Sequence, residues 1–541
     1  MRESRTSRVC CCVALQIGLV GVPLCIISHQ LESSLMRTAI VRVGLLCFVL
    51  VTVGLTQENA ATTSSSLPRA PGAQIFSLTP EAGWFTEPAI AVNPSNPQHV
   101  VAAYQDNVHI AYSTDAGAHW ENAEGVAPPN YKVSGDVSVT YDNKGRAYVC
   151  YIAFDKLGSF NYWARGATRN GIFVRRSLDG GRTWEKEHSP VAEQHTQPGI
   201  PFEDKPVIVA DNNTTSRYAG NLYVGWTRWR IADSQIVFSR STDGGKTWSQ
   251  AIEIDAHPGL PRDDNDGAEG FDAAVGRDGT IYAVWSQGDD IWLAVSHDGG
   301  EKFSRARAIL HTAPIMYAIA TLERANGFPQ IGVDTKSGRL YIAWTDYRNG
   351  DLDVFVATSD DHGKKWNTPV RVNNDAIHDG AEQFIQWMAV DPADGSVNVV
   401  FYDRRDDPQE IKQTVTLARS TDGGKTFANY AWTTNAFAAR SNLFFGDYSG
   451  LAAYGGRVYG IWTEVPPQPE KVKQDEGKNG VEAGGKDNAP SAIEQMQNSA
   501  APRTEENAEQ NKVSEEKKEN KSPGRPTGTV IKVGVADFNK K

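Results

Sequence analysis

Arginine and aromatic side chains recur in short polar segments that each follow a β-rich run. The binding candidates among them are Trp163, Arg228, Trp229, Arg230, Arg348, Arg404 and Arg405. A guanidinium group can hold a carboxylate through two parallel hydrogen bonds, and aromatic rings supply apolar contact area. If these segments converge on one concave surface, that surface is suited to an anionic or polyhydroxylated ligand.

A second set of side chains could exchange protons or act as nucleophiles. Its candidate catalytic members are Asp106, Asp136, Glu269 and Tyr448, and each lies near one end of a β-rich run. Further charged groups stand at similar places, namely Glu87, Asp204, Lys205, Asp272 and Asp447. Which of these groups meet depends on the elements that carry them.

One octet recurs six times and organises the chain. Its pattern is Ser-x-Asp-x-Gly-x-x-aromatic, and its aspartates are Asp115, Asp179, Asp243, Asp298, Asp361 and Asp422. Asp and Ser can accept hydrogen bonds from backbone N–H groups, while Gly permits the positive φ of a tight turn. The aromatic residue can pack back between sheets. Each octet is therefore predicted to be a structural turn between two antiparallel strands.

Each octet is preceded by further β-rich runs, so that every unit contains four strands. In the first unit these runs are Pro88–Asn93 and Val100–Tyr104. Four-stranded units repeated radially form a β-propeller. The octets and the turns between strands one and two then share one face. The loops between strands two and three share the other face with the links between units, and that face carries most of the candidate residues.

The two ends of the chain together predict one further unit. Residues 448–462 copy the first two strands of a unit without an octet, Gly528–Asp537 can supply a third strand and Gln74–Leu78 a fourth. We therefore predict an all-β protein with a seven-bladed propeller closed by both chain ends; a six-bladed ring is the alternative. Residues 466–526 contain no Phe, Trp or Tyr, so we predict a disordered insertion there.

Composition and the N-terminus indicate where the protein acts. The 541-residue chain has a net charge of −11, which argues against sequence-independent nucleic-acid binding. Residues 1–60 are predicted to be an export signal, with Met36 as an alternative start, because Met36-Arg37 precedes a short apolar run. The protein is thus expected to be secreted or periplasmic. A retained membrane anchor is the alternative, and it would be the only membrane contact.

The expected domain organisation follows from these segments. A polar linker at 61–72 leads into the propeller at 73–465, and the insertion at 466–526 is followed by a returning strand and tail at 527–541. Five of the six cysteines lie in the first 47 residues, so the mature chain would keep only Cys150 and no intrachain disulfide.

The six octets resemble the Asp-box repeat of the sialidase (neuraminidase) superfamily. The resemblance extends from Gln74 to Trp462 and implies an exported glycoside hydrolase that acts on a glycan or glycoprotein. Asp boxes also occur in propellers without catalytic activity, so a propeller that only binds glycan or protein is the alternative.

The resemblance also implies catalytic roles. The segment Phe445-Gly-Asp-Tyr-Ser-Gly-Leu is similar to the one that carries the family's tyrosine nucleophile, which makes Tyr448 the candidate. Gly267-Ala-Glu-Gly-Phe is similar to the segment of the assisting glutamate, here Glu269. Asp106 and Asp136 are the candidates for the family's acid/base aspartate.

Arg228, Arg348 and Arg404 follow second strands, where the family places arginines that bind the substrate carboxylate. Glu87, in contrast, stands where the family has such an arginine. Alternatively, Arg348 and Arg404 pair with nearby aspartates and fix loops. No cofactor is expected. The acidic run Asp263–Gly267 could hold Ca²⁺, and a solvated acidic turn is the alternative interpretation.

Overall fold

In a computed structural model of the chain, the structure describes residues 67–105, 107–125, 131–156, 169–195, 201–262, 266–314, 318–322, 324–433, 435–441, 443–467 and 528–540. The predicted export signal, nearly all of the predicted insertion, Asp106 and Trp163 lie outside these residues. Within the described part of the chain, no helix is long and apolar enough to cross a membrane.

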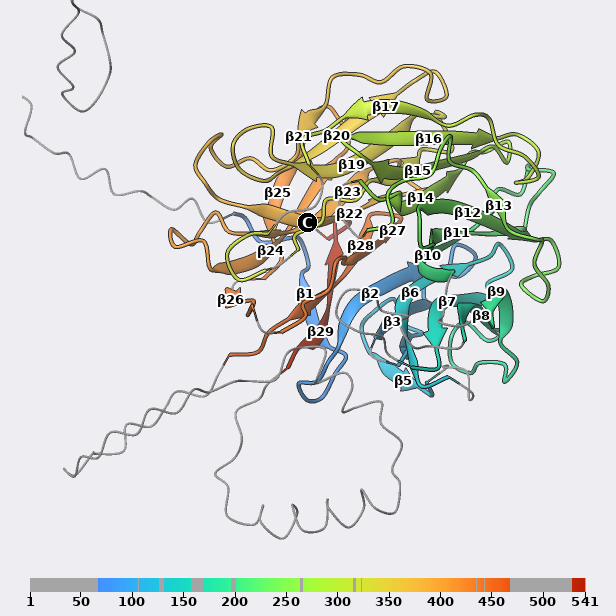
Figure 1. The fold of residues 1–541 in the computed structure, drawn as a ribbon. Coiled ribbons are helices and arrows are strands. Elements are labelled where there is room, and N and C mark those ends of the chain that lie inside the picture. The colour runs from blue at the N-terminus through green and yellow to red at the C-terminus, as the bar shows by residue number, and fades with distance from the viewer. Residues whose placement is uncertain are drawn as a thin grey trace, which may run out of the picture. The chain divides into compact units, whose positions relative to one another are not determined.

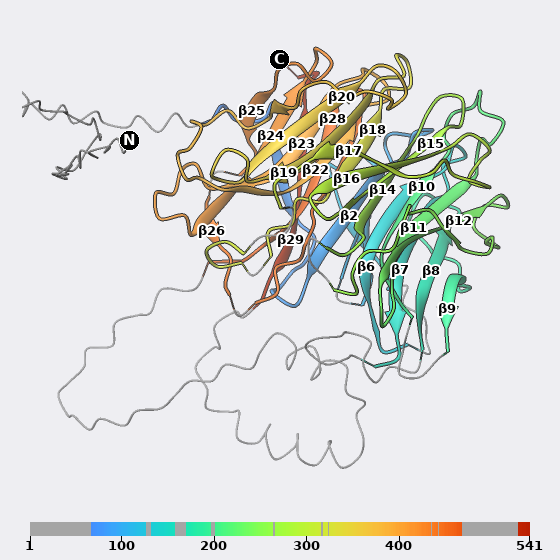
Figure 2. The same cartoon turned by 45° about the horizontal axis from the view of Figure 1, so that its top comes forward.

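The described strands form seven antiparallel sheets, which confirms the seven-bladed propeller. Blade 1 contains β2 (Thr86–Val92), β3 (Val100–Gln105), β4 (His109–Ser113) and β5 (Glu121–Ala123). Blade 2 contains β6 (Val133–Tyr141), β7 (Ala147–Phe154), β8 (Asn170–Ser177) and β9 (Ser189–Gln194). Blade 3 contains β10 (Phe202–Ala210), β11 (Leu222–Trp229), β12 (Ser234–Ser241) and β13 (Ile252–Glu253). Figure 2 shows β6 to β9 side by side in chain order.

The later blades repeat this order. Blade 4 contains β14 (Glu269–Val275), β15 (Ile281–Gln287), β16 (Asp290–Ser296) and β17 (Arg307–His311). Blade 5 contains β18 (Gln330–Val333), β19 (Leu340–Asp346), β20 (Asp353–Ser359) and β21 (Val370–Arg371). Blade 6 contains β22 (Gln383–Val390), β23 (Val397–Asp403), β24 (Lys412–Ser420) and β25 (Ala428–Ala431), and the short β26 (Phe437–Ala438) also pairs with β24.

Blade 7 is built from both ends of the chain, as predicted. Its strands are β27 (Gly450–Tyr454), β28 (Arg457–Glu464), β29 (Val530–Asp537) and β1 (Gln74–Ser77). β1 pairs antiparallel with β29 from Gln74 opposite Val535 to Ser77 opposite Lys532. Figure 1 shows the blue β1 beside the red β29.

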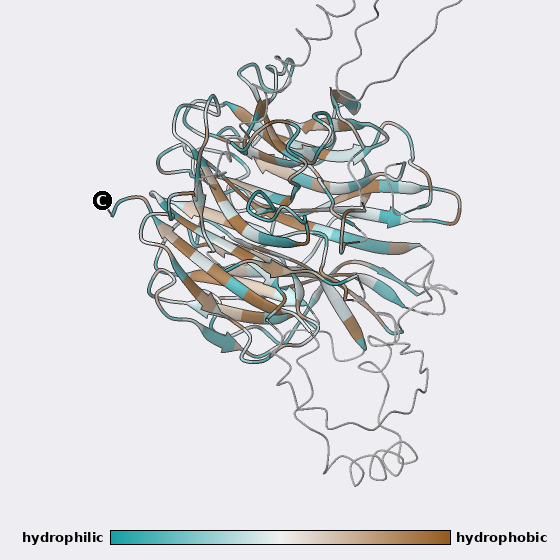
Figure 3. Ribbon diagram, turned by 90° about the vertical axis from the view of Figure 1, so that its left-hand side faces the viewer, coloured by the Kyte–Doolittle hydropathy of each residue, from teal (hydrophilic) through white to brown (hydrophobic). Residues whose placement is uncertain are grey.

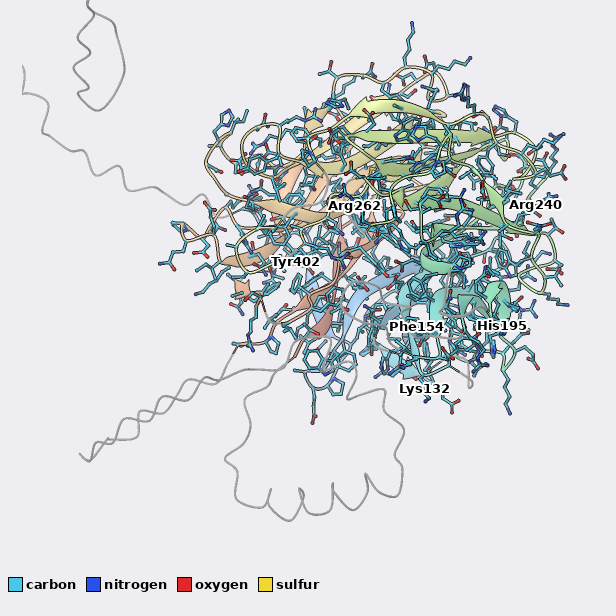
Figure 4. All side chains as sticks on the ribbon, in the orientation of Figure 1. Lys132, Phe154, His195, Arg240, Arg262 and Tyr402 are labelled. Atoms are coloured by element: carbon cyan, nitrogen blue, oxygen red, sulfur yellow. The ribbon has the colours of Figure 1, made fainter. Side chains whose placement is uncertain are left out.

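The hydrophobic core lies between neighbouring blades. Each of the seven described apolar clusters joins two adjacent blades, and one of them joins blade 7 to blade 1 through residues such as Ile90 and Val533. The hydrophobic colour in Figure 3 accordingly runs along the strands. Close packing restricts residue choice: a Cβ at Gly225 would lie 2.2 Å from the ring of Phe271 in the next blade. Tyr402, labelled in Figure 4, donates its hydroxyl proton to the Thr463 carbonyl of blade 7 at 2.9 Å.

All six octets form the predicted turn between the third and fourth strands. In each, the serine hydroxyl donates to the aspartate and accepts the N–H of the glycine four residues later. Burial alone would raise the pKa of Asp243, but hydrogen bonds from Thr247, Ser241 and Lys246 outweigh it and hold this pKa at about 2. The aspartates therefore act as ionised acceptors that fix the turn.

Replacing the octet tryptophan Trp248 with alanine should destabilise the protein. Trp248 is half-buried and packs against the core between blades 2 and 3. We expect a loss of about 2 kcal/mol, less than the ~3–5 kcal/mol for a fully buried tryptophan, measured by denaturant unfolding. The exposed Lys246→Ala in the same octet is the control. Equal stability of Trp248→Ala and the control would contradict the packing role.

Candidate functional site

A single pocket at the propeller centre receives residues from every blade. One lining residue from each blade, in order, is Pro88, Val137, Lys205, Gly270, Phe328, Trp387 and Tyr448. The pocket is thus the central channel, because only the innermost strands of all seven blades can meet in one place.

The innermost strands carry irregularities that face this channel. The strand register shifts within β2, β6, β10, β14 and β22, each time just after the first residues of the strand. At these bulges Glu87, Asp136, Lys205 and Ile385 adopt positive φ values of 50°, 47°, 48° and 50°. A bulge interrupts the ladder and redirects a side chain, so charged groups can point toward the channel. Strained non-glycine residues cluster at functional sites, so their repetition around the channel indicates a functional role for it.

Gln105 connects the bulges of the first two blades. Its side-chain nitrogen donates to the carboxylate of Glu87, and its side-chain oxygen accepts the N–H of Asp136 at 3.0 Å. Glu87 also accepts the N–H of Asp447 from blade 7 at 3.2 Å. Arg324 pairs with Asp447 at 2.8 Å. Side chains from blades 1, 2 and 7, with Arg324 ahead of blade 5, therefore form one charged cluster.

Tyr448 lies in this cluster under a cation. The Lys205 ammonium nitrogen is 3.9 Å from the centre of the Tyr448 ring and 4.9 Å from that of Phe328. The Tyr448 ring is also 6.1 Å from that of Trp387. The pocket thus has a wall of aromatic rings, and the Lys205 ammonium lies over two of them, Tyr448 and Phe328.

The cluster keeps several carboxyl groups close to their protonated form. Burial, followed by the charge of Asp447, raises the pKa of Glu87 to about 7. Burial and the charge of Glu87 raise the pKa of Asp136 to about 7, and burial does the same for Asp272. Such groups can both donate and accept a proton near neutral pH, as general acid–base chemistry requires.

The same charges act on the Tyr448 hydroxyl. Its pKa is raised well above 10, first by burial and then by nearby carboxylates, which in order of effect are Glu87, Asp136, Asp447 and Asp204. The phenol is therefore held protonated, and it can attack as a nucleophile only if a neighbouring carboxylate takes its proton. The four carboxylates that raise this pKa most come from blades 1, 2, 3 and 7, whereas Glu269, the predicted partner, begins blade 4.

The predicted arginines are held by partners in different blades. Arg228 pairs with the buried Glu203 at 2.9 Å, and Arg348 pairs with Asp346, which confirms the loop-fixing alternative for Arg348. Arg404 is 1% exposed and donates to the carbonyls of Glu410 and Ala320, and burial lowers its pKa to about 10. Among the described residues, these three guanidinium groups share no acceptor.

The other predicted binding residues also have structural partners. Arg230 pairs with Asp233 at 2.6 Å, and Arg405 pairs with Asp403 at 2.6 Å. Trp229 is buried and donates its indole N–H to Asp204 at 2.8 Å, so it positions a channel carboxylate. These residues were expected to form a shared binding surface. In the structure, each of them instead bonds to a carboxylate of its own blade.

The acidic run considered for Ca²⁺ is described only in part. Residues 263–265 lie outside the described range, and Asp266 pairs with Arg262, which is labelled in Figure 4. Within the described chain, no group of three or more acidic, histidine or cysteine side chains is arranged to hold a metal ion.

Sequence reasoning did not identify Gln105, Arg324 and Trp387 as members of the site. Gln105 stands beside the candidate Asp106, and Trp387 belongs to the repeated first-strand element, so position in the repeat could have identified both. Arg324 precedes β18 in an irregular segment and carries no such signal.

No protein-family model matches the chain. A stretch of 99 residues is 33% identical to a sialidase of Bacteroides fragilis, and this match covers 15% of the chain and 18% of that protein. The chain thus spans about a fifth of the length of this curated relative.

Several solved structures are also similar to the chain. One is a sialidase from Streptococcus pneumoniae, with 12% identity and a TM-score of 0.42; the match covers 61% of this chain and 67% of that one. Another is an intramolecular trans-sialidase from Ruminococcus gnavus, with 16% identity and a TM-score of 0.41; the match covers 62% of this chain and 94% of that one. An ulvan lyase is similar as well, with 12% identity and a TM-score of 0.41; the match covers 70% of this chain and 92% of that one. The sheet topology defines the class as a seven-bladed β-propeller, and the local sequence match makes it sialidase-like.

The raised pKa of Glu87 predicts a pH-dependent stability. A carboxyl group with a higher pKa in the folded state stabilises the fold fully below its unfolded pKa of about 4.5 and loses this contribution as the pH rises through about 7. Glu87→Gln mimics the protonated form. Between pH 5 and pH 8 we expect wild type to lose about 2 kcal/mol more unfolding free energy than Glu87→Gln.

Denaturant unfolding at both pH values measures this difference. The exposed Glu81→Gln is the matched control and should follow wild type. Parallel pH profiles for wild type and Glu87→Gln would show that Glu87 is ionised in the folded protein at pH 5.

Proposed function

We propose that the protein is an exported glycoside hydrolase whose active site is the charged cluster in the central channel. The observation that carries this proposal is the position of Tyr448 among carboxyl groups, two of which, Glu87 and Asp136, have pKa values of about 7. The sialidase-like sequence match supports a glycan or glycoprotein as the substrate. Export rests on the predicted signal in residues 1–60.

The proposed chemistry divides roles between a nucleophile and proton-transfer groups. Tyr448 attacks the anomeric carbon and passes its proton to a neighbouring carboxylate, a role for which Glu87 and Asp136 are the candidates because, after burial, they raise the tyrosine pKa most. A protonated carboxyl group gives its proton to the leaving oxygen as the glycosidic bond breaks, and water, deprotonated by the resulting carboxylate, then releases the sugar from the tyrosine oxygen. Asp106 and Glu269 remain candidates for these roles from the sequence resemblance.

A propeller that binds glycan or protein without catalysis is the second candidate. It is favoured by the arginines, because Arg228 and Arg348 are each engaged by a carboxylate of their own blade. Guanidinium groups that already hold a carboxylate give less support to a clamp for a substrate carboxylate.

Turnover measurements on the full chain test the proposal. We expect hydrolysis of at least one member of a panel of fluorogenic glycosides that includes a sialoside. Tyr448→Phe removes one oxygen with little change in volume, so it should lower kcat by ~100-fold or more while the thermal midpoint stays the same. Tyr347→Phe, at a 43% exposed tyrosine, is the control and should retain activity.

Two results would decide against parts of this proposal. Full activity of Tyr448→Phe would remove the tyrosine nucleophile. Absence of turnover for every glycoside by folded wild-type protein would leave the binding propeller as the function.

A further inference from the structure

A second cavity opens on the face of the propeller that carries the octets and the turns between first and second strands. It has a volume of about 440 Å³, within the ~300–1,000 Å³ typical of small-molecule sites. Its lining comes from the first-to-second-strand turns of blades 3, 4 and 5, from β15 and from the octet of blade 5. None of the residues placed in the channel cluster lines it, so it is a separate candidate site.

The cavity lies where blade 4 lacks a side chain that blade 2 has. The turns 142–146 and 276–280 have equal length, and in both the first residue donates its N–H to the carbonyl of the fifth. Gly276 therefore occupies the position that Asp142 has in blade 2. A Cβ at Gly276 would lie 3.5 Å from the Tyr282 ring, so the missing side chain leaves space against that ring.

The tyrosine beside this position has a different partner in the two blades. In blade 2, the Asp142 carboxylate accepts the Tyr148 hydroxyl at 3.0 Å. In blade 4, Gly276 offers no carboxylate, and the Tyr282 hydroxyl instead lies 3.1 Å from Nδ1 of His362 in the next octet. The place that an acidic side chain fills in blade 2 is therefore open in blade 4 to the acidic group of a ligand.

His362 lines the same cavity in a strained conformation. Its φ is 62°, whereas four of the other five octets have a glycine at this position, with φ between 71° and 79°. Glycine adopts positive φ without steric cost, and a histidine does not. Backbone strain of this kind clusters at ligand sites, which adds a second reason to expect a ligand here.

Cations outnumber anions in the lining. Arg277 and Lys336 are exposed and line the cavity together with one carboxylate, Asp278. Asp278 accepts the N–H and the hydroxyl of Thr280 at 3.0 and 2.9 Å, so its own turn uses it. Lys336 donates to the carbonyl of Ala393, and neither cation forms an ion pair within the described part of the chain. The cavity thus carries a net positive charge.

The lining favours an acidic ligand that is larger than a simple ion. A guanidinium group can hold a carboxylate through two parallel hydrogen bonds, and a single excess positive charge matches a carboxylate better than a phosphate dianion. The hydroxyl groups of Thr335 and Ser337 also line the cavity and can bond to hydroxyl groups of a ligand.

We propose that this cavity binds a sugar acid. The carboxylate of the sugar acid takes the place of the side chain that Gly276 lacks, and it pairs with Arg277 and Lys336. The site is a second binding site of the protein, beyond the proposed active site and independent of it.

Titration calorimetry on the full chain at low salt with glucuronate, glucose and inorganic phosphate tests the proposal. We expect glucuronate to bind at least tenfold more tightly than glucose or phosphate. Arg277→Gln should weaken glucuronate binding at least tenfold with an unchanged thermal midpoint, because this exposed guanidinium forms no ion pair with the described residues. Arg182→Gln, at an exposed arginine of the second octet, is the matched control and should bind as wild type does.

Gly276→Asn is a second test, because asparagine is the residue at the same turn position in blade 1, Asn93. Gly276 does not have a positive φ, and the nearest neighbour of the new Cβ would be the exposed Asp278 carboxylate at 3.3 Å, which can move. This variant should fill the cavity beside Tyr282 and abolish glucuronate binding while the thermal midpoint stays the same.

Two further measurements separate the site and the source of its ligand. Tyr448→Phe should lose turnover and keep glucuronate binding, so failure of the proposed hydrolase is a separate result. Binding of cellobiouronic acid as well as glucuronate would support the acidic end of a glycan as the ligand, and binding of glucuronate alone would support a free sugar acid. The proposal is overturned if wild type binds no glucuronate, if Arg277→Gln binds it equally well, or if glucose or phosphate binds as tightly.

Discussion

The antiparallel pairing of β1 with β29 joins the first described strand to the last and completes the seventh blade. The channel cluster depends on this pairing, because Glu87 in blade 1 accepts the N–H of Asp447 just before blade 7. If the ring were open, neither the apolar interface between these blades nor the contact across it would be fixed. The pairing of β1 with β29 thus stabilises the propeller and also holds the channel cluster together.

The inner ring combines backbone irregularity with polar side chains. Backbone N–H groups of the innermost strands find side-chain partners in neighbouring blades, at a bulge and also at the regular strand β18. Asp136 accepts the N–H of Lys205 at 3.3 Å, and Asp272 accepts the N–H of Ile331 at 2.8 Å. These two carboxyl groups therefore link adjacent blades by hydrogen bonds and also lie at the channel. Their structural and proposed chemical roles arise from the same position.

The channel differs in its distribution of charge from the outer ends of the second strands. At or just after the ends of the second strands, Arg228, Arg348 and Arg405 each pair with a carboxylate of the same blade. In the channel, acidic groups outnumber the cations Lys205 and Arg324, and burial, followed by the charge of neighbouring carboxylates, raises the pKa values of Glu87 and Asp136. These paired arginines thus hold the scaffold, whereas the excess of acidic groups lies in the channel.

The amino-acid sequence by itself determined the octet turns, the four-stranded units and the closure of the ring, because these features depend on local patterns that repeat along the chain. It also located Glu87, Asp136, Lys205 and Tyr448 at equivalent ends of first strands. Only the tertiary structure decided that Arg228 and Arg348 are occupied by carboxylates, and that the amide of Asn326 has no hydrogen-bond partner among the described residues. Those outcomes depend on distances between residues far apart in the chain and on burial, and neither quantity is encoded in a repeat pattern.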